Sequence, residues 1–163
     1  NLRPNVEYLE ELGVTDIGQV VTKFPSILAL SIEDNLEPTI KYLIKNCNAT
    51  IKDIENVPSL VGLSLELRIK PRCLFLTSKK MEKKYKPSCL LIPPDKKLMQ
   101  KTNLDINEFN RFKIKYYDDL ISRAIAQENY KLANDACNYA KKSTDDQNII
   151  KKYDLLKKEI KKL

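Results

Sequence analysis

The sequence predicts an all-α fold of stacked helical repeats, followed by a group of longer helices. The block Pro-Ser-Ile-Leu-Ala-Leu-Ser-Ile at 25–32 returns at 58–65 as Pro-Ser-Leu-Val-Gly-Leu-Ser-Leu. A second block at 4–9 returns at 38–43 and again at 71–76, each time beginning with proline. A fixed period of roughly 33 residues is typical of helical solenoids. The chain also has only three glycines among 163 residues, which favours helices over sheets.

Each repeat is expected to begin with a proline in the first turn of a helix, where its missing N–H has no cost. The first helix is predicted from Pro4 to Leu12, with Gly13 as its C-terminal stop. A second helix is predicted from Asp16 to Phe24, capped by Thr15. Pro25 then ends this helix, because the residue before a proline avoids helical geometry.

The second repeat follows the same plan. A short turn or 3₁₀ segment at 26–30 leads to the capping pair Ser31 and Asp34. A helix is predicted from Leu36 to Lys45, and Thr50 with Asp53 caps the next one. Apolar positions shared by the repeats are expected to be mostly buried where the units stack: Tyr8, Leu9, Leu30, Tyr42, Leu43 and Leu63.

The pattern Leu-x-Pro-x-x-x-Tyr/Phe-Leu, a short helix, and then Phe/Val-Pro-x-Ile/Leu-x-x-Leu-Ser resembles the mitochondrial transcription termination factor (mTERF) repeat. Pro71-Arg72 is similar to the Pro-Arg pair of late repeats in that family. The resemblance covers residues 2–76 well and 77–112 loosely. It implies a right-handed superhelix of helical triplets, an organellar location, and binding of double-stranded DNA or structured RNA. The third repeat is compressed, because Pro87-Ser88 follows Pro58-Ser59 more closely than Pro58-Ser59 follows Pro25-Ser26.

Positive charge is concentrated in one stretch of the chain. Residues 1–70 hold 7 Lys/Arg against 10 Asp/Glu, residues 71–101 hold 9 against 2, and residues 102–163 hold 13 against 10. Clustered cations indicate a polyanion site, although charge runs are often solvated linkers. Lysines suit phosphate contacts more than base reading. The candidate nucleic-acid-binding residues are Arg68, Lys70, Arg72, Lys79, Lys80, Lys83, Lys84, Lys86, Lys96, Lys97 and Lys101.

A second domain is predicted at 102–163, after repeats at 1–101. Asp105 and Glu108 are expected to form a capping box before a long amphipathic helix. A tight turn at Glu128-Asn129 leads to a helix rich in alanine, and a last helix is expected to start near Thr144. We interpret these elements as an αα-hairpin with a capping helix. A tetratricopeptide-like hairpin is the alternative.

Several classes of chemistry find no support in the sequence. There is no histidine, no Cys-x-x-Cys pair among the four cysteines, and no Gly-rich phosphate loop or nucleophile elbow. We therefore expect a non-enzyme without metal or cofactor, with buried free thiols in a reducing compartment. No apolar run is long enough to span a membrane. Because the chain begins within a repeat and without Met, we expect that either a leader has been removed or the sequence is only the ordered part.

Together with the location and role that the mTERF resemblance implies, these observations predict an organellar nucleic-acid-binding protein in organelle gene expression. Two to three repeats span about 20–30 Å, less than one DNA turn of about 34–36 Å. We therefore expect a structural or assembly component bound to ribosomal RNA in a mitochondrial (or plastid) ribosome, with the C-terminal helices contacting neighbouring proteins. The alternatives are a transcription terminator on double-stranded DNA and a protein-interaction adaptor.

Overall fold

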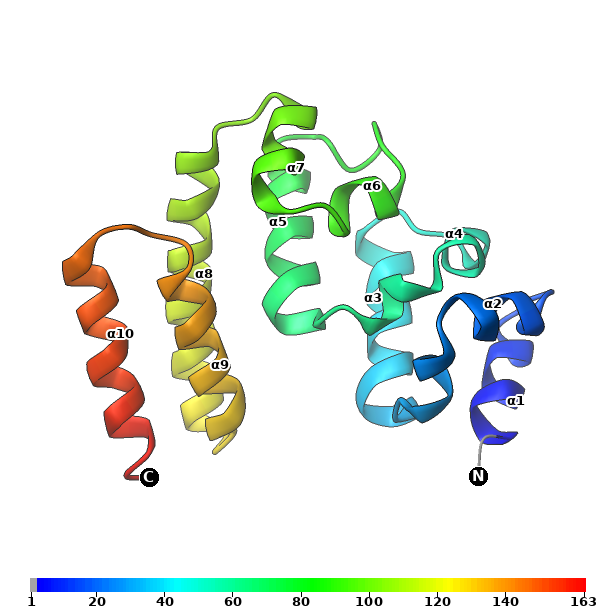
Figure 1. Ribbon diagram of the computed structural model, residues 1–163, viewed down its shortest axis with the longest axis horizontal. Coiled ribbons are helices and arrows are strands. Elements are labelled where there is room, and N and C mark those ends of the chain that lie inside the picture. The colour runs from blue at the N-terminus through cyan, green and yellow to red at the C-terminus, as the bar shows by residue number, and fades with distance from the viewer. Residues whose placement is uncertain (1–2) are drawn as a thin grey trace. The chain divides into compact units, whose positions relative to one another are not determined.

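The computed structural model describes residues 3–163, and these residues form helices without any strand (Figure 1). The all-α helical-repeat prediction is confirmed. The chain divides into two compact units, with the boundary between Leu98 and Met99. The first unit contains α1 (Arg3–Glu11), α2 (Ile17–Lys23), η1 (Pro25–Ala29), η2 (Ile32–Leu36), α3 (Glu37–Asn46), α4 (Ile51–Asn56), η3 (Pro58–Gly62), η4 (Leu65–Ile69), α5 (Lys70–Ser78), α6 (Pro87–Leu91) and the first half of α7 (Asp95–Thr102).

The helices α3 and α5 each have a proline in the first turn, as predicted. Each continues directly from a π-helical turn, η2 or η4, whose cap is Ser31 or Ser64. In η2 the Leu36 amide donates to the Ser31 carbonyl at 3.0 Å, and η4 has the equivalent bond in the next repeat. A proline inside a regular helix clashes with the carbonyl four residues before it. The wider π turn accommodates Pro38 and Pro71 without breaking the helix.

Three helices of the first unit end in the same way. The second residue after each helix has a positive φ, with values of 91° at Gly13, 55° at Asn48 and 56° at Lys80. The amide of the next residue then donates back to a carbonyl near the helix end, as Met81 does to Leu76 at 2.9 Å. This is the Schellman ending, which satisfies carbonyls that the last turn leaves unpaired. The predicted stop at Gly13 is confirmed.

A polar side chain after each repeat proline is buried against the backbone. The Asn5 side-chain amide donates to the carbonyls of Ile27 at 2.9 Å and Leu30 at 2.8 Å, which joins α1 to η1. The equivalent residue of the second repeat, Thr39, is buried as well. Arg72 takes the position in the third repeat. Short helical segments leave many carbonyls without partners. This position provides a side-chain donor from α1 to η1 and from α5 to α6.

Neighbouring repeats are joined by Glu55, which is 2% exposed. Its carboxylate accepts from the Thr15 hydroxyl at 2.7 Å and from the Asp16 amide at 3.2 Å. The hydrogen bond from Thr15 holds the pKa of Glu55 below its usual value. Thr15 was expected to cap α2, but Asp16 is the cap and accepts from the Gln19 amide at 2.8 Å. The Thr15 hydroxyl instead donates to Glu55 of the second repeat, and the sequence around Thr15 does not indicate this contact.

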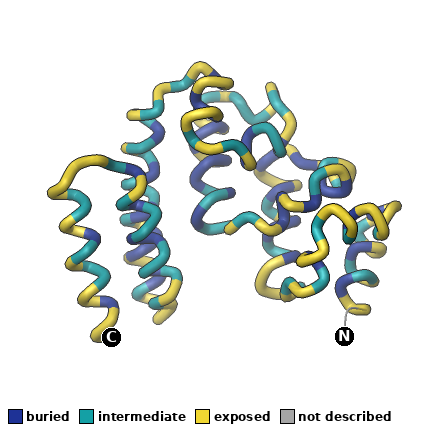
Figure 2. The backbone as a smooth tube through the Cα atoms, in the orientation of Figure 1, coloured by how far each residue is buried: buried dark blue, intermediate teal, exposed yellow. Residues whose placement is uncertain are grey.

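The core of the first unit lies where the repeats stack, as Figure 2 shows by the buried faces of its helices. Leu9 and Leu43 are fully buried, as predicted. The other shared positions are half-buried: Tyr8, Leu30, Tyr42 and Leu63. The capping pairs are also confirmed. The Thr50 hydroxyl accepts from the Asp53 amide at 3.1 Å, and the Asp53 carboxylate accepts from the Thr50 amide at 2.9 Å.

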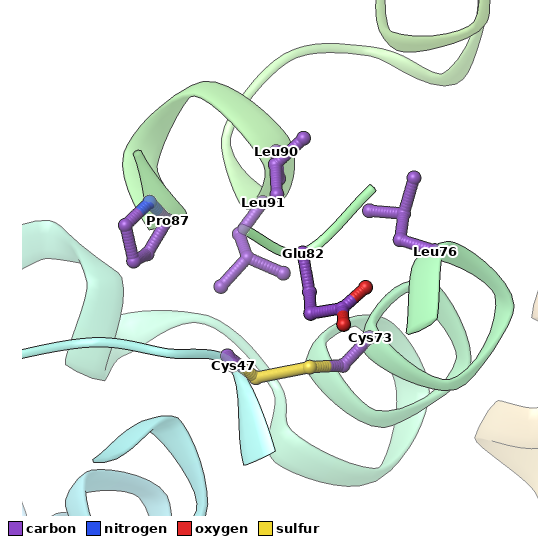
Figure 3. A pocket seen from close by; sticks show the side chains of 7 residues that line it. All are labelled: Cys47, Cys73, Leu76, Glu82, Pro87, Leu90 and Leu91. Atoms are coloured by element: carbon purple, nitrogen blue, oxygen red, sulfur yellow. A yellow bond between two sulfur atoms is a disulfide. The ribbon is translucent and has the colours of Figure 1, made fainter. Parts of the chain in front are cut away.

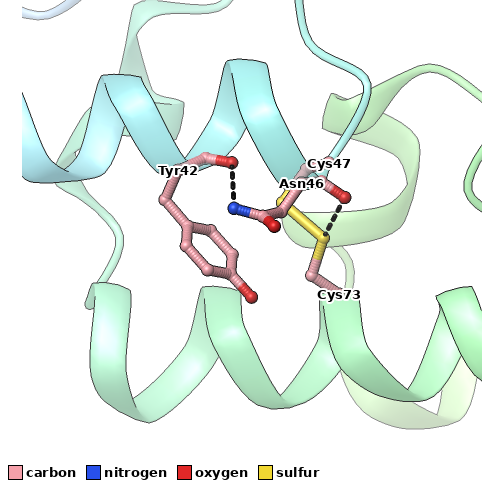
Figure 4. The surroundings of a disulfide bond; sticks show 4 residues. All are labelled: Tyr42, Asn46, Cys47 and Cys73. Atoms are coloured by element: carbon pink, nitrogen blue, oxygen red, sulfur yellow. Dashed lines mark hydrogen bonds between the residues drawn. A yellow bond between two sulfur atoms is a disulfide. The ribbon is translucent and has the colours of Figure 1, made fainter.

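A disulfide joins Cys47, at the end of α3, to Cys73 in α5 (Figure 4). The expectation of free thiols is therefore wrong for this pair. The stacking of two repeats brings the Cα atoms, 26 residues apart in sequence, to 5.9 Å, which is within the usual disulfide range. Both residues are 4% exposed. The other two cysteines, Cys89 and Cys137, are free.

The second unit contains α8 (Ile106–Ala126), α9 (Tyr130–Lys141) and α10 (Gln147–Ile160) after the end of α7. α9 packs against both α8 and α10. Four buried alanines line these contacts: Ala124, Ala133, Ala136 and Ala140. Asp105 caps α8 and accepts from the Asn107 amide. The last helix was expected near Thr144 but begins after Asp146, which supplies the cap.

A polar cluster joins α10 to α8. Tyr153 is fully buried, and its hydroxyl donates to Asp118 Oδ1 at 2.7 Å. Lys152 donates to the same carboxylate at 2.9 Å. Burial, and then the hydrogen bond to Asp118, raise the pKa of the Tyr153 hydroxyl. The cluster therefore fixes the register of α10 against α8.

Candidate nucleic-acid interface

The lysine-rich segment at 79–86 links α5 to α6, and we call it the lysine linker. Its path is set at both ends. The left-handed residue Lys80 turns the chain away from α5, and Pro87 begins α6. Between them the Lys84 amide donates to the Met81 carbonyl at 3.0 Å, which closes a tight turn. The linker is therefore held in a defined conformation at its two ends and in its middle.

An open groove of about 400 Å³ runs between the lysine linker and the α3–α4 turn of the preceding repeat. Charge is distributed unequally over its walls. The linker wall is cationic, whereas the opposite wall holds amide, hydroxyl and carboxylate groups. The lining residues are Asn48, Thr50, Asp53, Lys83, Lys84, Tyr85, Lys86 and Pro87. The three groove lysines are all exposed.

The acidic residue of the linker, Glu82, faces inward. Its side chain lines a small apolar cavity of about 10 Å³ beside the disulfide, together with Leu76 and Leu91 (Figure 3). Its Oε2 atom is buried and has no hydrogen-bond partner among the described residues. A cavity of this size is at the lower limit for one water molecule. Glu82 therefore does not share the solvent face with the linker lysines.

The two arginines on the candidate list have structural contacts. Arg72 is 3% exposed, and its guanidinium donates to the carbonyls of Leu90 and Leu91 and to Asp95 at 2.6 Å. Arg68 donates to the carbonyl of Leu91 at 2.9 Å and to those of the two residues after it. Both side chains donate to backbone carbonyls at the C-terminal end of α6. In the compressed third repeat this end lies within reach of the two arginines. Arg72 is withdrawn as a nucleic-acid ligand for this reason.

The remaining cations fall into three settings. Lys70 is half-buried, forms an ion pair with Glu66, and lies 5.7 Å from the centre of the Tyr42 ring. Lys79 is also half-buried, with its ammonium 5.6 Å from the centre of the Phe75 ring. The exposed lysines are Lys80, Lys83, Lys84 and Lys86 in the linker, Lys96 and Lys97 at the start of α7, and Lys101 near its end. Lys101 belongs to the second unit.

Tyr85 and Asn48 line the groove but are not among the binding residues predicted from the sequence. Tyr85 lies among the linker lysines and lines the groove with them. Its position inside the run Lys83-Lys84-Tyr85-Lys86 was an available signal, because aromatic residues between cations are common in nucleic-acid sites. Asn48 reaches the groove from the preceding repeat. Nothing in its local sequence indicates this, because only the stacking of the repeats brings it there.

Residues 3–163 contain no group of three or more His, Cys, Asp or Glu placed to hold a metal ion. Over the same residues, no helix is both long and apolar enough to cross a membrane.

Comparison with known proteins relates the chain to a family model and to a curated protein. The mTERF family model matches residues 1–99. The chloroplastic transcription termination factor MTERF2 of Arabidopsis thaliana is 31% identical over 113 residues. That match covers 68% of this chain but only 17% of the relative, so the chain spans about a sixth of its length. No solved structure matches the chain.

Proposed function

The chain belongs to the mTERF family, and on that premise we propose that it is an organellar nucleic-acid-binding protein in organelle gene expression. We further propose that it is a structural or assembly component bound to ribosomal RNA. A mitochondrial location is proposed from the family resemblance, with a plastid as the alternative. The chloroplastic location of the relative is the observation that supports the plastid alternative.

The observation that supports nucleic-acid binding most directly is the groove beside the lysine linker. Three exposed lysines line one side of it, and the nearby acidic residue, Glu82, faces the interior. A surface of this kind attracts phosphate groups at long range. Binding then gains free energy when counterions are released from the nucleic acid.

The preference for structured RNA is supported by the placement of the arginines. Arginine is the residue best suited to bidentate reading of base edges. Arg68 and Arg72 are occupied by the carbonyls at the end of α6, so the interface consists of lysines. Lysines neutralise phosphates without reading sequence. We therefore expect the protein to select the shape of a folded RNA rather than a base sequence.

The first experiment measures RNA affinity against salt concentration. The variant replaces Lys80, Lys83, Lys84 and Lys86 by Gln, and the probe is a short RNA three-way junction. The negative slope of log K against log salt should become shallower by roughly 0.7–0.9 for each lost phosphate contact. A matched control neutralises four exposed lysines elsewhere: Lys45, Lys151, Lys158 and Lys161. The proposal fails if both variants keep the wild-type slope.

A competition experiment separates the alternative functions. Duplex DNA of the same length is added to the complex of protein and RNA junction at physiological salt. Weak competition supports the RNA proposal, whereas equal competition by random duplex DNA supports the transcription terminator. Binding to neither nucleic acid supports the protein-interaction adaptor.

A further inference from the structure

The groove beside the lysine linker has walls of different chemistry. On the linker wall, Lys83, Lys84 and Lys86 are exposed and cationic. On the opposite wall, Asp53 is an anion, and its carboxylate accepts from the amide and hydroxyl of Thr50 at 2.9 and 2.8 Å. A run of phosphates filling the groove would meet this carboxylate. The groove therefore suits a ligand with a phosphate at one end and a neutral group at the other.

The aromatic residue of the groove supplies a surface for such a neutral group. Tyr85 is half-buried and lines the groove together with Lys84 and Lys86. The tight turn at Lys84 and the start of α6 at Pro87 fix the backbone on both sides of it. An aromatic ring beside cationic groups is the usual platform on which a nucleobase stacks while its phosphate is neutralised.

The opposite wall can contact the edge of a base. Asn48 is exposed and lines the groove at the end of α3, where its φ of 55° sets the direction of the chain. Its amide can both donate and accept. Thr50 and Asp53 are bonded to one another in the cap of α4, so Asn48 is the amide of this wall that is available to a ligand. The groove volume of about 400 Å³ falls in the range of small-ligand sites.

We propose that this groove binds one unpaired nucleotide of a folded RNA. Its base stacks on Tyr85 beside Asn48, and its phosphates contact the linker lysines. This inference rests on the proposed function. A base within a duplex is covered on both faces by its neighbours, so only a bulged or junction nucleotide can present a face to Tyr85. Tyr85 thereby selects an RNA shape without selecting a sequence, because every base has a π face.

The test compares two RNA hairpins that differ by one bulged nucleotide. Tyr85→Leu removes the ring and keeps an apolar side chain, whereas Tyr85→Phe keeps the ring. Tyr85→Leu should weaken binding of the bulged hairpin by about 5–100-fold, while binding of the fully paired hairpin stays within about twofold. Tyr85→Phe should bind both hairpins like the wild type. Because no lysine is changed, the salt slope should also stay the same.

A second measurement uses the unaltered protein, so it does not depend on the folding of a variant. A 2-aminopurine placed at the bulge should lose fluorescence when the wild type binds, because stacking on a ring quenches it. Unchanged fluorescence at saturation would overturn the inference. So would equal weakening of both hairpins by Tyr85→Leu, although phosphate binding would then stand. If the wild type bound neither hairpin, the proposed function itself would fail.

Discussion

The two units of this protein are held together by different means. The repeat unit is made of short segments, such as α3 with 10 residues. Buried polar side chains join these segments by donating to backbone carbonyls or accepting from neighbouring repeats. The second unit is made of helices of up to 21 residues with alanine-rich contacts. Each helix leaves about four carbonyls and four amides unpaired, whatever its length. A unit of many short helices therefore needs more side-chain partners for its backbone.

The variant with the largest expected effect tests whether the short helices depend on side-chain partners for their backbone carbonyls. Replacing Arg72 by Ala removes the donor to the buried Leu90 carbonyl, one of the two arginine donors to the Leu91 carbonyl, and the ion pair between Arg72 and Asp95. We expect a loss of about 3–5 kcal/mol in the free energy of unfolding. Chemical unfolding of the wild type and variant measures it. The control is Lys152→Ala in the second unit, an exposed ion pair whose loss should cost less than about 1 kcal/mol. Equal effects would break the comparison between the units.

Reduction of the disulfide should have the next largest effect on stability, and it concerns the repeat unit alone. Cys47 and Cys73 close a segment of 26 residues, and reduction should destabilise the protein by about 3–4 kcal/mol, as the chain-entropy model gives. Unfolding with and without a reductant measures this difference. The double variant Cys47→Ser, Cys73→Ser should be as unstable as the reduced protein and should not respond to reductant. If the wild type also failed to respond, the disulfide would not contribute to stability.

The stability of the second unit should have its own dependence on pH. Because the pKa of Tyr153 is raised in the folded state, its contribution is complete below the ordinary value of about 10 and declines as pH rises above it. Tyr153→Phe removes the hydrogen bond to Asp118, at an expected cost of about 1.5–3 kcal/mol at neutral pH. It should also flatten the alkaline decline, which unfolding at a series of pH values would reveal. A decline equally steep in the variant would assign it to other groups.

The acid side of the stability profile should depend on the repeat unit instead. The pKa of Glu55 is lowered in the folded state, so its contribution is present above its ordinary value of about 4.3. The contribution is lost as pH falls through the lowered pKa. Glu55→Gln should lower the denaturation midpoint at neutral pH and reduce the loss of stability on acidification. An unchanged acid profile would show that the bonds to Thr15 and Asp16 do not link the repeats.

The smallest effect concerns helix ends, which both units share. Glu128, after α8, and Gly13, after α1, both have positive φ, at 57° and 91°. Only glycine adopts this region without strain. Glu128→Gly should stabilise the protein by roughly 0.5–1 kcal/mol, and Gly13→Ala should destabilise it by about 1–2 kcal/mol. No atom lies within 4 Å of the added Cβ at Gly13, so packing cannot explain a loss. Changes of the same sign would contradict the backbone argument.

The sequence by itself determined the features that depend on neighbouring residues. The repeat period, the caps at Ser31 and Thr50, and the stop at Gly13 follow from local preferences, and the structure confirms them. The concentration of lysines at 79–101 was also visible, because charge can be counted along a chain. The π turns before Pro38 and Pro71 were not foreseen, because a widened turn and a regular N-terminus share the same local residues.

Only the tertiary structure decided which distant groups meet. It joined Cys47 to Cys73, directed Arg72 to the carbonyls of α6, and placed Tyr85 across a groove from Asn48. Each of these pairings depends on how one repeat stacks on the next and on where the compressed third repeat ends. A local pattern can show that an arginine or a tyrosine occurs beside lysines. It cannot show whether that side chain faces solvent or backbone, because its environment comes from residues 18–40 positions away.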